Sequence, residues 1–174
     1  MKVLKRILII ILIIFALIQF IRPPKNKSQG ISAKDISTIY PIPDSIESIL
    51  KVACNDCHSN NTRYPWYAEI QPVAWWLNDH IVDGKKDLNF SEFNKYPIRK
   101  QYFKFDEIEK LVKENVMPLP SYTWIHKDAD LTDRQKLAIM GWARSLKDSL
   151  KANYPPDSFV RKKEYKLIFS KNLK

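Results

Sequence analysis

The chain has 174 residues, the size of one ordinary domain with short appendages. Few glycines (3), many prolines (11) and 12% aromatic residues favour helices joined by stiff connections around an aromatic-rich core. The formal charge of +10 is spread along the chain and belongs to no nucleic-acid-binding motif, so we exclude a nucleic-acid-binding module.

Residues 1–22 have the composition of an export signal. Lys2, Lys5 and Arg6 precede an apolar run from Ile7 to Ile21 that only Gln19 interrupts. No small-x-small cleavage site follows, so we expect an uncleaved signal anchor, a transmembrane helix over 1–22, in preference to a cleaved signal peptide. The basic flank keeps the N-terminus in the cytoplasm. This predicts a protein of the bacterial inner membrane whose soluble domain faces the periplasm.

The remainder of the chain divides into three parts. Residues 23–42 contain prolines and a polar middle and predict a linker. Residues 43–156 carry helical patterns and predict one all-α domain, whose first helix begins near Pro43 and leads into a pair of cysteines. Residues 157–174 form a basic tail, for which the sequence favours no single structure.

The motif Cys54-Asn55-Asp56-Cys57-His58 is the most informative stretch of the chain. On a helical turn, residues i, i+3 and i+4 share one face, so both thiols can reach the two vinyl groups of one porphyrin. The imidazole of His58 then points at the iron from the same side. This is the attachment pattern of a c-type haem, and histidine is the usual proximal ligand. We therefore predict one haem c, covalently bound through Cys54 and Cys57.

Other interpretations of the cysteine pair stay open at this point. A thioredoxin-like redox pair requires a βαβ setting, which the flanking sequence does not offer. A zinc site requires two further ligands, for which only His80 and His126 are left. A structural disulfide would suit an oxidising compartment. Each of these describes a haem-free CxxC module.

Further helical segments are predicted after the motif, most with recognisable ends. Pro72 suits the first turn of the next helix, and Gly84 is expected just past its end. A capping box at Thr132, preceded by an apolar staple, opens the last helix. The predicted segments cover 72–83, a short helix from Ser91 that stops before Pro97, 105–115, and 132–153.

Met117 is the predicted distal ligand of the iron. It precedes a proline in an extended segment over 116–120, which can present its sulfur to a buried cavity. His80 is the alternative ligand, and His126 or an open sixth site are further options. The non-functional interpretation is that Met117 fills a gap in the core, as methionines often do.

Side chains that follow the motif are predicted to contact the cofactor. Tyr64 and Trp66 can wall a flat porphyrin, and a phenol or an indole can bond to a propionate. Arg63 can pair with a propionate, and it can equally well be an exposed arginine.

The order of these segments resembles the class I cytochromes c, in which the first and last helices pack together and a loop methionine closes the far side of the iron. A closer resemblance, over residues 40–150, is to the bacterial haem-binding domain family. It implies a cytochrome c-like, all-α domain that binds haem, and little more about physiological role. The resemblance is carried by Cys57-His58-Ser59-Asn60, Tyr64-Pro65-Trp66-Tyr67, Trp75-Trp76, His80, Leu88-Asn89-Phe90-Ser91, Met117-Pro118-Leu119 and Leu131-Thr132.

From these features we expect an electron carrier rather than an enzyme. Lysines around the haem edge would steer redox partners that have an acidic docking surface. Two other classes of function are retained as alternatives. One is a peroxidase-like haem enzyme or sensor with an open or displaceable sixth site, and the other is the haem-free CxxC module.

Overall fold

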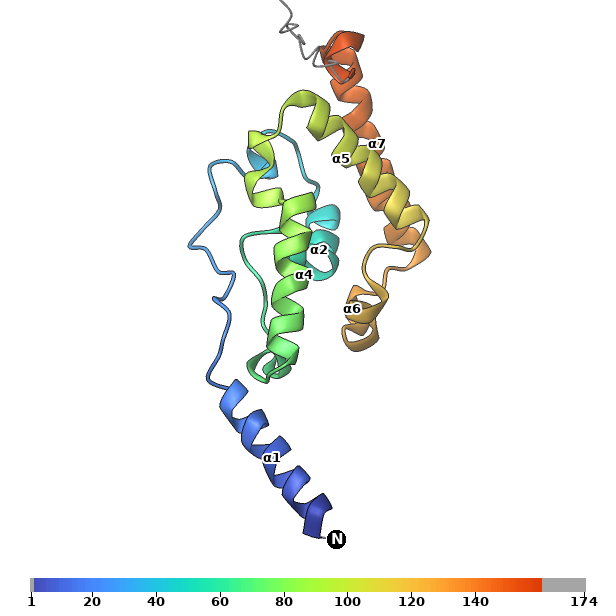
Figure 1. The fold of residues 1–174 in the computed structure, drawn as a ribbon. Helices are drawn as coiled ribbons and strands as arrows, with labels where there is room; N and C mark the ends of the chain where they lie inside the picture. The colour runs from blue at the N-terminus through green and yellow to red at the C-terminus, as the bar shows by residue number, and fades with distance from the viewer. Residues whose placement is uncertain (1, 161–174) are drawn as a thin grey trace, which may run out of the picture.

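The computed structural model describes residues 2–160, and over these residues it consists of helices and loops without a strand (Figure 1). The all-α fold class is therefore confirmed. The basic tail beyond residue 160 lies outside the described residues. The α-helices are α1 (Lys2–Ile18), α2 (Asp44–Ala53), α3 (Asn55–His58), α4 (Val73–Asp87), α5 (Ile98–Lys113), α6 (Pro120–Ile125) and α7 (Asp133–Asn153), and the 3-10 helices are η1 (Ile36–Thr38), η2 (Trp66–Glu69), η3 (Phe90–Lys95), η4 (Lys127–Ala129) and η5 (Pro156–Phe159).

The core lies between α2, η3 and the pair α5 and α7, which run side by side along one flank of the domain (Figure 1). Phe93, Phe105 and Ile139 are fully buried there, and the rings of Phe105 and Trp142 meet edge to face with centroids 6.0 Å apart. Burial of such large side chains is the main favourable term in folding. The first and last helices of the domain, α2 and α7, are thus held in one core.

Helix α7 begins as its sequence predicts. The hydroxyl of Thr132 accepts a hydrogen bond from the Gln135 N–H, and the Gln135 side chain accepts one from the Thr132 N–H. These two bonds form a capping box, which satisfies backbone donors that the first turn leaves unpaired.

The predicted end of α4 at Gly84 is wrong, because the helix continues through this residue to Asp87. A side chain at Gly84 would meet the backbone of α3, since a Cβ built there lies 2.9 Å from the carbonyl oxygen of Cys57. The glycine therefore permits close packing of two helices instead of ending one. Helix α5 also differs from the prediction, since it begins at Ile98, directly after Pro97.

Helix α1 is apolar after its basic first turns, and its residues 2–17 are exposed. It covers 17 residues and ends at Ile18. In the described part of the chain, no helix is both long and apolar enough to cross a membrane, so the predicted transmembrane helix over 1–22 is not supported.

Parts of the segment predicted as a linker, 23–42, contribute to the packed domain. Ile36 is 2% exposed and belongs to the main core cluster. The hydroxyl of Tyr40 bonds to the buried side chain of Gln101. Near the other end of the segment, Asn26 bonds to residues that follow the cysteine motif. These contacts lie outside the predicted domain boundary at residue 43.

Candidate haem site

The cysteine motif forms the helical turn on which the sequence argument depends. Helix α2 ends at Ala53, and α3 follows with Cys54 at its N-terminal end. The backbone N–H groups of Cys57 and His58 both bond to the carbonyl oxygen of Cys54, at 3.2 and 3.0 Å. The two cysteines are free thiols, and both line the same cavity. The backbone thus presents two thiols and an imidazole from a single turn.

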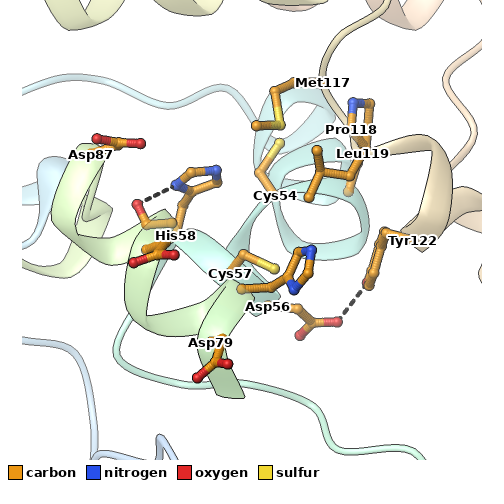
Figure 2. Close-up of a pocket in the computed structure, with 14 residues that line it drawn as sticks. Cys54, Asp56, Cys57, His58, Asp79, Asp87, Met117, Pro118, Leu119 and Tyr122 are labelled. Atoms are coloured by element: carbon orange, nitrogen blue, oxygen red, sulfur yellow. Dashed lines mark hydrogen bonds between the residues drawn. The ribbon is translucent and has the colours of Figure 1, made fainter. Parts of the chain in front are cut away.

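The ring of His58 is fixed by two backbone carbonyl groups. Its Nδ1 lies 2.9 Å from the oxygen of Gly84 and 3.0 Å from that of Leu88. Because carbonyl oxygens only accept hydrogen bonds, Nδ1 must carry the proton, which leaves the lone pair on Nε2. Metal-binding histidines characteristically donate their second ring N–H in this way, which sets the tautomer and the ring orientation. Figure 2 shows the bonded nitrogen on the side of α4 and the other nitrogen facing the cavity.

Two adjoining cavities surround this turn, with volumes of about 230 and 380 Å³. Cys54, His58, Asp87 and Met117 line both of them, so the two cavities form one cleft with these residues at the junction. Figure 2 shows these four residues with the others that line the smaller cavity. Joined, the two cavities fall within the ~300–1,000 Å³ that cofactor sites usually occupy. The larger cavity has apolar walls from several elements, formed by Leu50, Leu88, Phe90, Ile108, Leu111, Val112 and Ile139.

The structure brings both predicted distal ligands to the cleft. Met117 follows α5, where its N–H and that of Val116 bond to the oxygen of Leu111 at 3.2 and 2.9 Å. His80 lies on α4 and lines only the smaller cavity. Its Nδ1 lies 2.8 Å from the Trp76 oxygen, so its Nε2 also keeps a free lone pair.

The other predicted contacts are not brought to the cleft. Tyr64 accepts a hydrogen bond from the Asn26 N–H at 2.6 Å and lies beside Lys25. Trp66 is 77% exposed on η2. Neither residue lines either cavity. Arg63 pairs with a carboxylate of the protein itself, that of Asp56.

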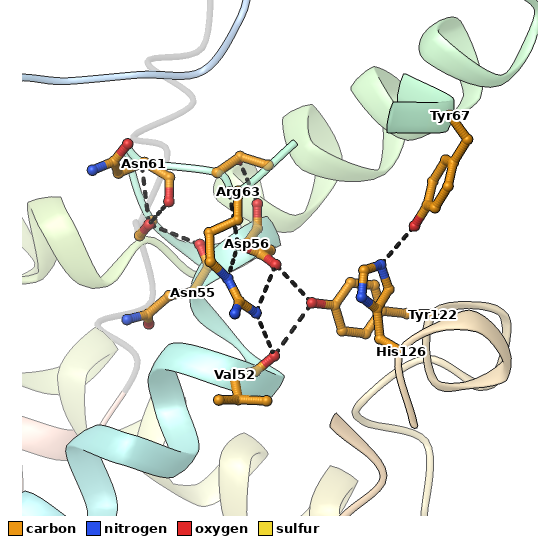
Figure 3. Close-up of polar contacts among 10 residues, drawn as sticks. Val52, Asn55, Asp56, Asn61, Arg63, Tyr67, Tyr122 and His126 are labelled. Carbon is orange, nitrogen blue, oxygen red and sulfur yellow. Dashed lines mark hydrogen bonds and ion pairs between the residues drawn. The ribbon is translucent and has the colours of Figure 1, made fainter. Parts of the chain in front are cut away.

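Asp56, inside the motif, is a functional candidate that the sequence argument missed. Only 6% exposed, it accepts hydrogen bonds from the Tyr122 hydroxyl at 2.7 Å and from the Arg63 N–H at 2.9 Å, besides the Arg63 guanidinium (Figure 3). Burial, reinforced by the bond to Asp56, raises the pKa of Tyr122. Since Tyr122 lies on α6, just after Met117, this bond ties the methionine loop to the cysteine turn. The only sequence signal was a carboxylate between two cysteines, with nothing to indicate its partner.

The cysteine thiols are electrostatically unlike those of a reactive redox pair. Burial, with the neighbouring Cys57, raises the pKa of Cys54 to about 12, and burial with the neighbouring Asp56 raises that of Cys57 to about 11. The reactive thiol of a redox-active CxxC pair instead has a lowered pKa. Within residues 2–160, no group of three or more His, Cys, Asp and Glu side chains is arranged to hold a metal ion.

Charge is distributed unevenly around the cleft. Asp79, Asp83 and Asp87 follow one another at four-residue intervals along α4 beside the smaller cavity, and all three are exposed. Lys104 and Lys110 of α5 lie at the larger cavity with two carboxylates, those of Glu107 and Asp87, and Lys104 forms an ion pair with Glu107. The three carboxylates of α4 therefore make one side of the cleft acidic, while the two lysines lie on the α5 side.

The sequence model of one protein family, described as the haem-binding domain, matches residues 13–145, which is more than half of the chain. The matched range contains the cysteine turn, Met117, Tyr122 and the first part of α7. Neither the curated proteins nor the solved structures gave a significant match.

Proposed function

The chain belongs to the haem-binding domain family, and from this premise we propose that it is a c-type haem protein that transfers electrons. Cys54 and Cys57 would hold the haem covalently, with His58 as the proximal ligand. The observation that carries the proposal is the geometry of His58, whose Nδ1 donates to two carbonyls while Nε2 faces a cleft shared with two thiols and Met117. A bound haem would supply a one-electron couple there.

Met117 is the better candidate for the distal ligand. The ring of His58 is held from α4, through Gly84 and Leu88. His80 belongs to that same helix, four residues before Gly84, and therefore approaches from the proximal side. Met117 comes from a separate segment between α5 and α6 and lines both cavities. A thioether ligand raises the reduction potential relative to a second histidine, which suits an electron carrier.

The protein's own residues would set the conditions for electron transfer. The two carbonyls bonded to Nδ1 hold the imidazole in one orientation, so that little reorganisation accompanies a change of charge. The apolar side chains of the larger cavity exclude water and lower the local dielectric. We assign no residue to the transformation of a substrate, and the protein acts as a carrier.

We further propose that the domain acts on the periplasmic side of the bacterial inner membrane, with α1 inserted in the bilayer. Support comes from the basic start of the chain and from the exposed apolar side chains of α1. A redox partner with an acidic surface would dock on the α5 side of the cleft, where Lys104 and Lys110 lie, since Asp79 and Asp83 make the α4 side acidic.

The experiment that tests this function is expression of the full chain in an exporting bacterium with haem-attachment machinery. We expect haem to remain on the denatured polypeptide in a gel, and to be absent from a Cys54→Ala, Cys57→Ala variant. Folded protein without attached haem would contradict the proposal.

The distal ligand is tested in the same preparation. We expect Met117→Leu to abolish the absorption that arises from a thioether–iron bond, while Met140→Leu, at the edge of the core, leaves the spectrum unchanged. Loss of the low-spin spectrum in His80→Ala would instead assign the ligand to His80. If neither Met117→Leu nor His80→Ala affects the haem spectrum, the haem enzyme or sensor with an open sixth site is favoured.

A further inference from the structure

Large apolar side chains are exposed together at one end of the domain. Trp66 on η2 and Trp124 on α6 are each 77% exposed, and Ile125 beside Trp124 is 53% exposed. Ile70, directly after η2, is also exposed. Singly exposed apolar residues are ordinary, but a contiguous group of them indicates an interaction surface.

These residues form one surface, because η2 and α6 are joined by side-chain contacts. The hydroxyl of Tyr67 and Nε2 of His126 lie 2.6 Å apart (Figure 3). Tyr67 also packs edge to face against Trp66. His126 in turn stacks on Tyr122 of α6, with ring centroids 4.3 Å apart. Residues distant in sequence are thereby held side by side. We call Trp66, Ile70, Trp124 and Ile125 the aromatic end.

Helix α1 leaves the domain at this same end (Figure 1). The side chain of Gln19 bonds to the backbone of Gln71, accepting from its N–H at 2.9 Å and donating to its oxygen at 3.3 Å. The indole N–H of Trp75 donates to the oxygen of Ile21 at 2.9 Å. Arg22 forms an ion pair with Glu69 of η2. These bonds fix the C-terminal end of α1 against η2.

We propose that the aromatic end lies in the interfacial layer of the same bilayer that receives α1. Hydrogen bonds and an ion pair hold the end of α1 against η2, which carries Trp66, so a bilayer that takes up α1 lies close to the aromatic end. Tryptophan favours the membrane–water interface, because its ring is apolar and its N–H is polar. The basic residues Arg22, Lys25 and Lys27 at this junction suit anionic headgroups.

The docked end would fix the orientation of the haem cleft. The cysteine turn is connected to the aromatic end through Asp56, Tyr122 and His126. The cleft would then stand at a constant height and tilt above the bilayer, which favours electron exchange with a membrane-bound partner. This inference rests on the proposed insertion of α1 and does not depend on the identity of the distal ligand.

The test uses nitroxide labels on the full chain in vesicles of phosphatidylcholine and phosphatidylglycerol. Once haem is attached, Cys54 and Cys57 are thioethers, so an introduced cysteine is the single free thiol. Labels are placed by Trp66→Cys or Trp124→Cys in the aromatic end, by Ile14→Cys in α1, and by Phe103→Cys as a control. Phe103 is an exposed aromatic residue on α5, whose neighbour Tyr102 contacts η5 at the opposite end of the domain.

We expect labels at positions 66 and 124 to be severalfold less accessible to a water-soluble nickel relaxer, and more accessible to oxygen, than the label at 103. If they match the label at 103 while the label at 14 is buried in lipid, the docking is wrong and the insertion of α1 stands. If the label at position 14 is in water, both the docking of the aromatic end and the insertion of α1 are wrong. Haem absorbance of the same samples reports separately whether the proposed haem is bound. If haem absorbance is absent, the depths of the labels in the bilayer are measured in a Cys54→Ala, Cys57→Ala background.

A second measurement leaves the labels out. In oriented multilayers, the haem signal of the unaltered protein should show one defined tilt. The paired variant Trp66→Ser, Trp124→Ser should broaden the distribution of tilt, and the matched control Phe103→Ser should not. Equal distributions in all three proteins would overturn the inference.

Discussion

Asp56 occupies a position between the two cysteines that a haem-attachment motif leaves free, yet its carboxylate is buried and bonded on several sides. A buried carboxylate is tolerated only where hydrogen bonds replace its hydration. Tyr122 and Arg63 provide these bonds, and Tyr122 brings with it the loop that carries Met117. One side chain of the motif thus positions the far wall of the cleft.

At the residue scale we predict that Tyr122→Phe lowers the free energy of unfolding by about 1–3 kcal/mol, because a buried acceptor loses its donor. We also expect the proposed bond between Met117 and the haem iron to weaken, so that added imidazole displaces Met117 at lower concentration. Urea unfolding and imidazole titration measure these two effects. Tyr154→Phe, which alters a partly exposed tyrosine on the far end of α7, is the control. A Tyr122→Phe protein that behaves like the control would show that Asp56 does not hold the loop.

At the scale of elements, the close contact of α3 with α4 determines the proximal side of the cleft. Gly84 permits this contact, because only a residue without a Cβ fits against the carbonyl of Cys57. The same glycine supplies one of the two carbonyls that orient His58. Separation of α3 from α4 would therefore disturb both the packing of these helices and the orientation of the His58 imidazole.

We predict that Gly84→Ala destabilises the fold by about 1–3 kcal/mol through overpacking and reduces the yield of attached haem. Gly141→Ala provides a matched control, since Gly141 is also helical but has no atom within 4 Å of an added Cβ. There the better helix propensity of alanine should stabilise the protein by up to about 1 kcal/mol. Thermal unfolding and haem staining measure the two outcomes. Stabilisation by both changes would refute the close contact.

A second prediction at this scale concerns the pair α5 and α7. A hydrogen bond from Arg144, with a second from Lys147, lowers the pKa of Glu109 below its ordinary value. A carboxyl group with a lowered folded pKa stabilises the protein above its unfolded pKa, and this contribution is lost as pH falls. Glu109→Gln should therefore cost about 1 kcal/mol at neutral pH, and this cost should shrink as pH falls below the ordinary glutamate pKa of about 4.3 and vanish only below the lowered pKa of the folded protein.

Urea unfolding at a series of pH values measures this difference. Glu114→Gln is the control, because Glu114 is exposed and forms no ion pair within the described residues. A loss of stability in Glu109→Gln that is the same at pH 3 and pH 7 would show that the charge is not its cause.

At the scale of the whole molecule, Asn26 connects the segment after α1 to the haem site. Its Nδ2 donates to the Ser59 oxygen at 2.8 Å and to the Thr62 hydroxyl at 2.9 Å, and its backbone N–H donates to Tyr64 at 2.6 Å. Residues 19–26 therefore act as a strap along the domain. The orientation of α1 relative to the cleft depends on this strap.

We predict that Asn26→Ala increases the rate of trypsin cleavage after Lys25 or Lys27 severalfold, because the strap loses its side-chain bonds. The expected loss of global stability is smaller, about 1 kcal/mol. Asn153→Ala serves as the control, because that side chain bonds to Ser149 within α7. Unchanged cleavage rates would mean that the strap is held by other contacts.

The features that the sequence determined are those that depend on neighbours along the chain. Membership of the haem-binding domain family and the all-α class both follow from local patterns, and both are confirmed. The spacing of Cys54, Cys57 and His58 defines one face of a helical turn, and the capping box at Thr132 defines the start of α7. Such signals extend over three or four residues, which is the range of helical periodicity.

Only the tertiary structure decided which distant residues complete the site. The bond between Asp56 and Tyr122 joins positions 66 residues apart, and Gly84 is required by a carbonyl 27 residues before it. The tertiary structure also decided that Ile36 belongs to the core and that Trp66 lies at the end of the domain instead of at the cleft. Contacts of this kind depend on how helices pack in three dimensions, and packing leaves no periodic pattern in the order of residues.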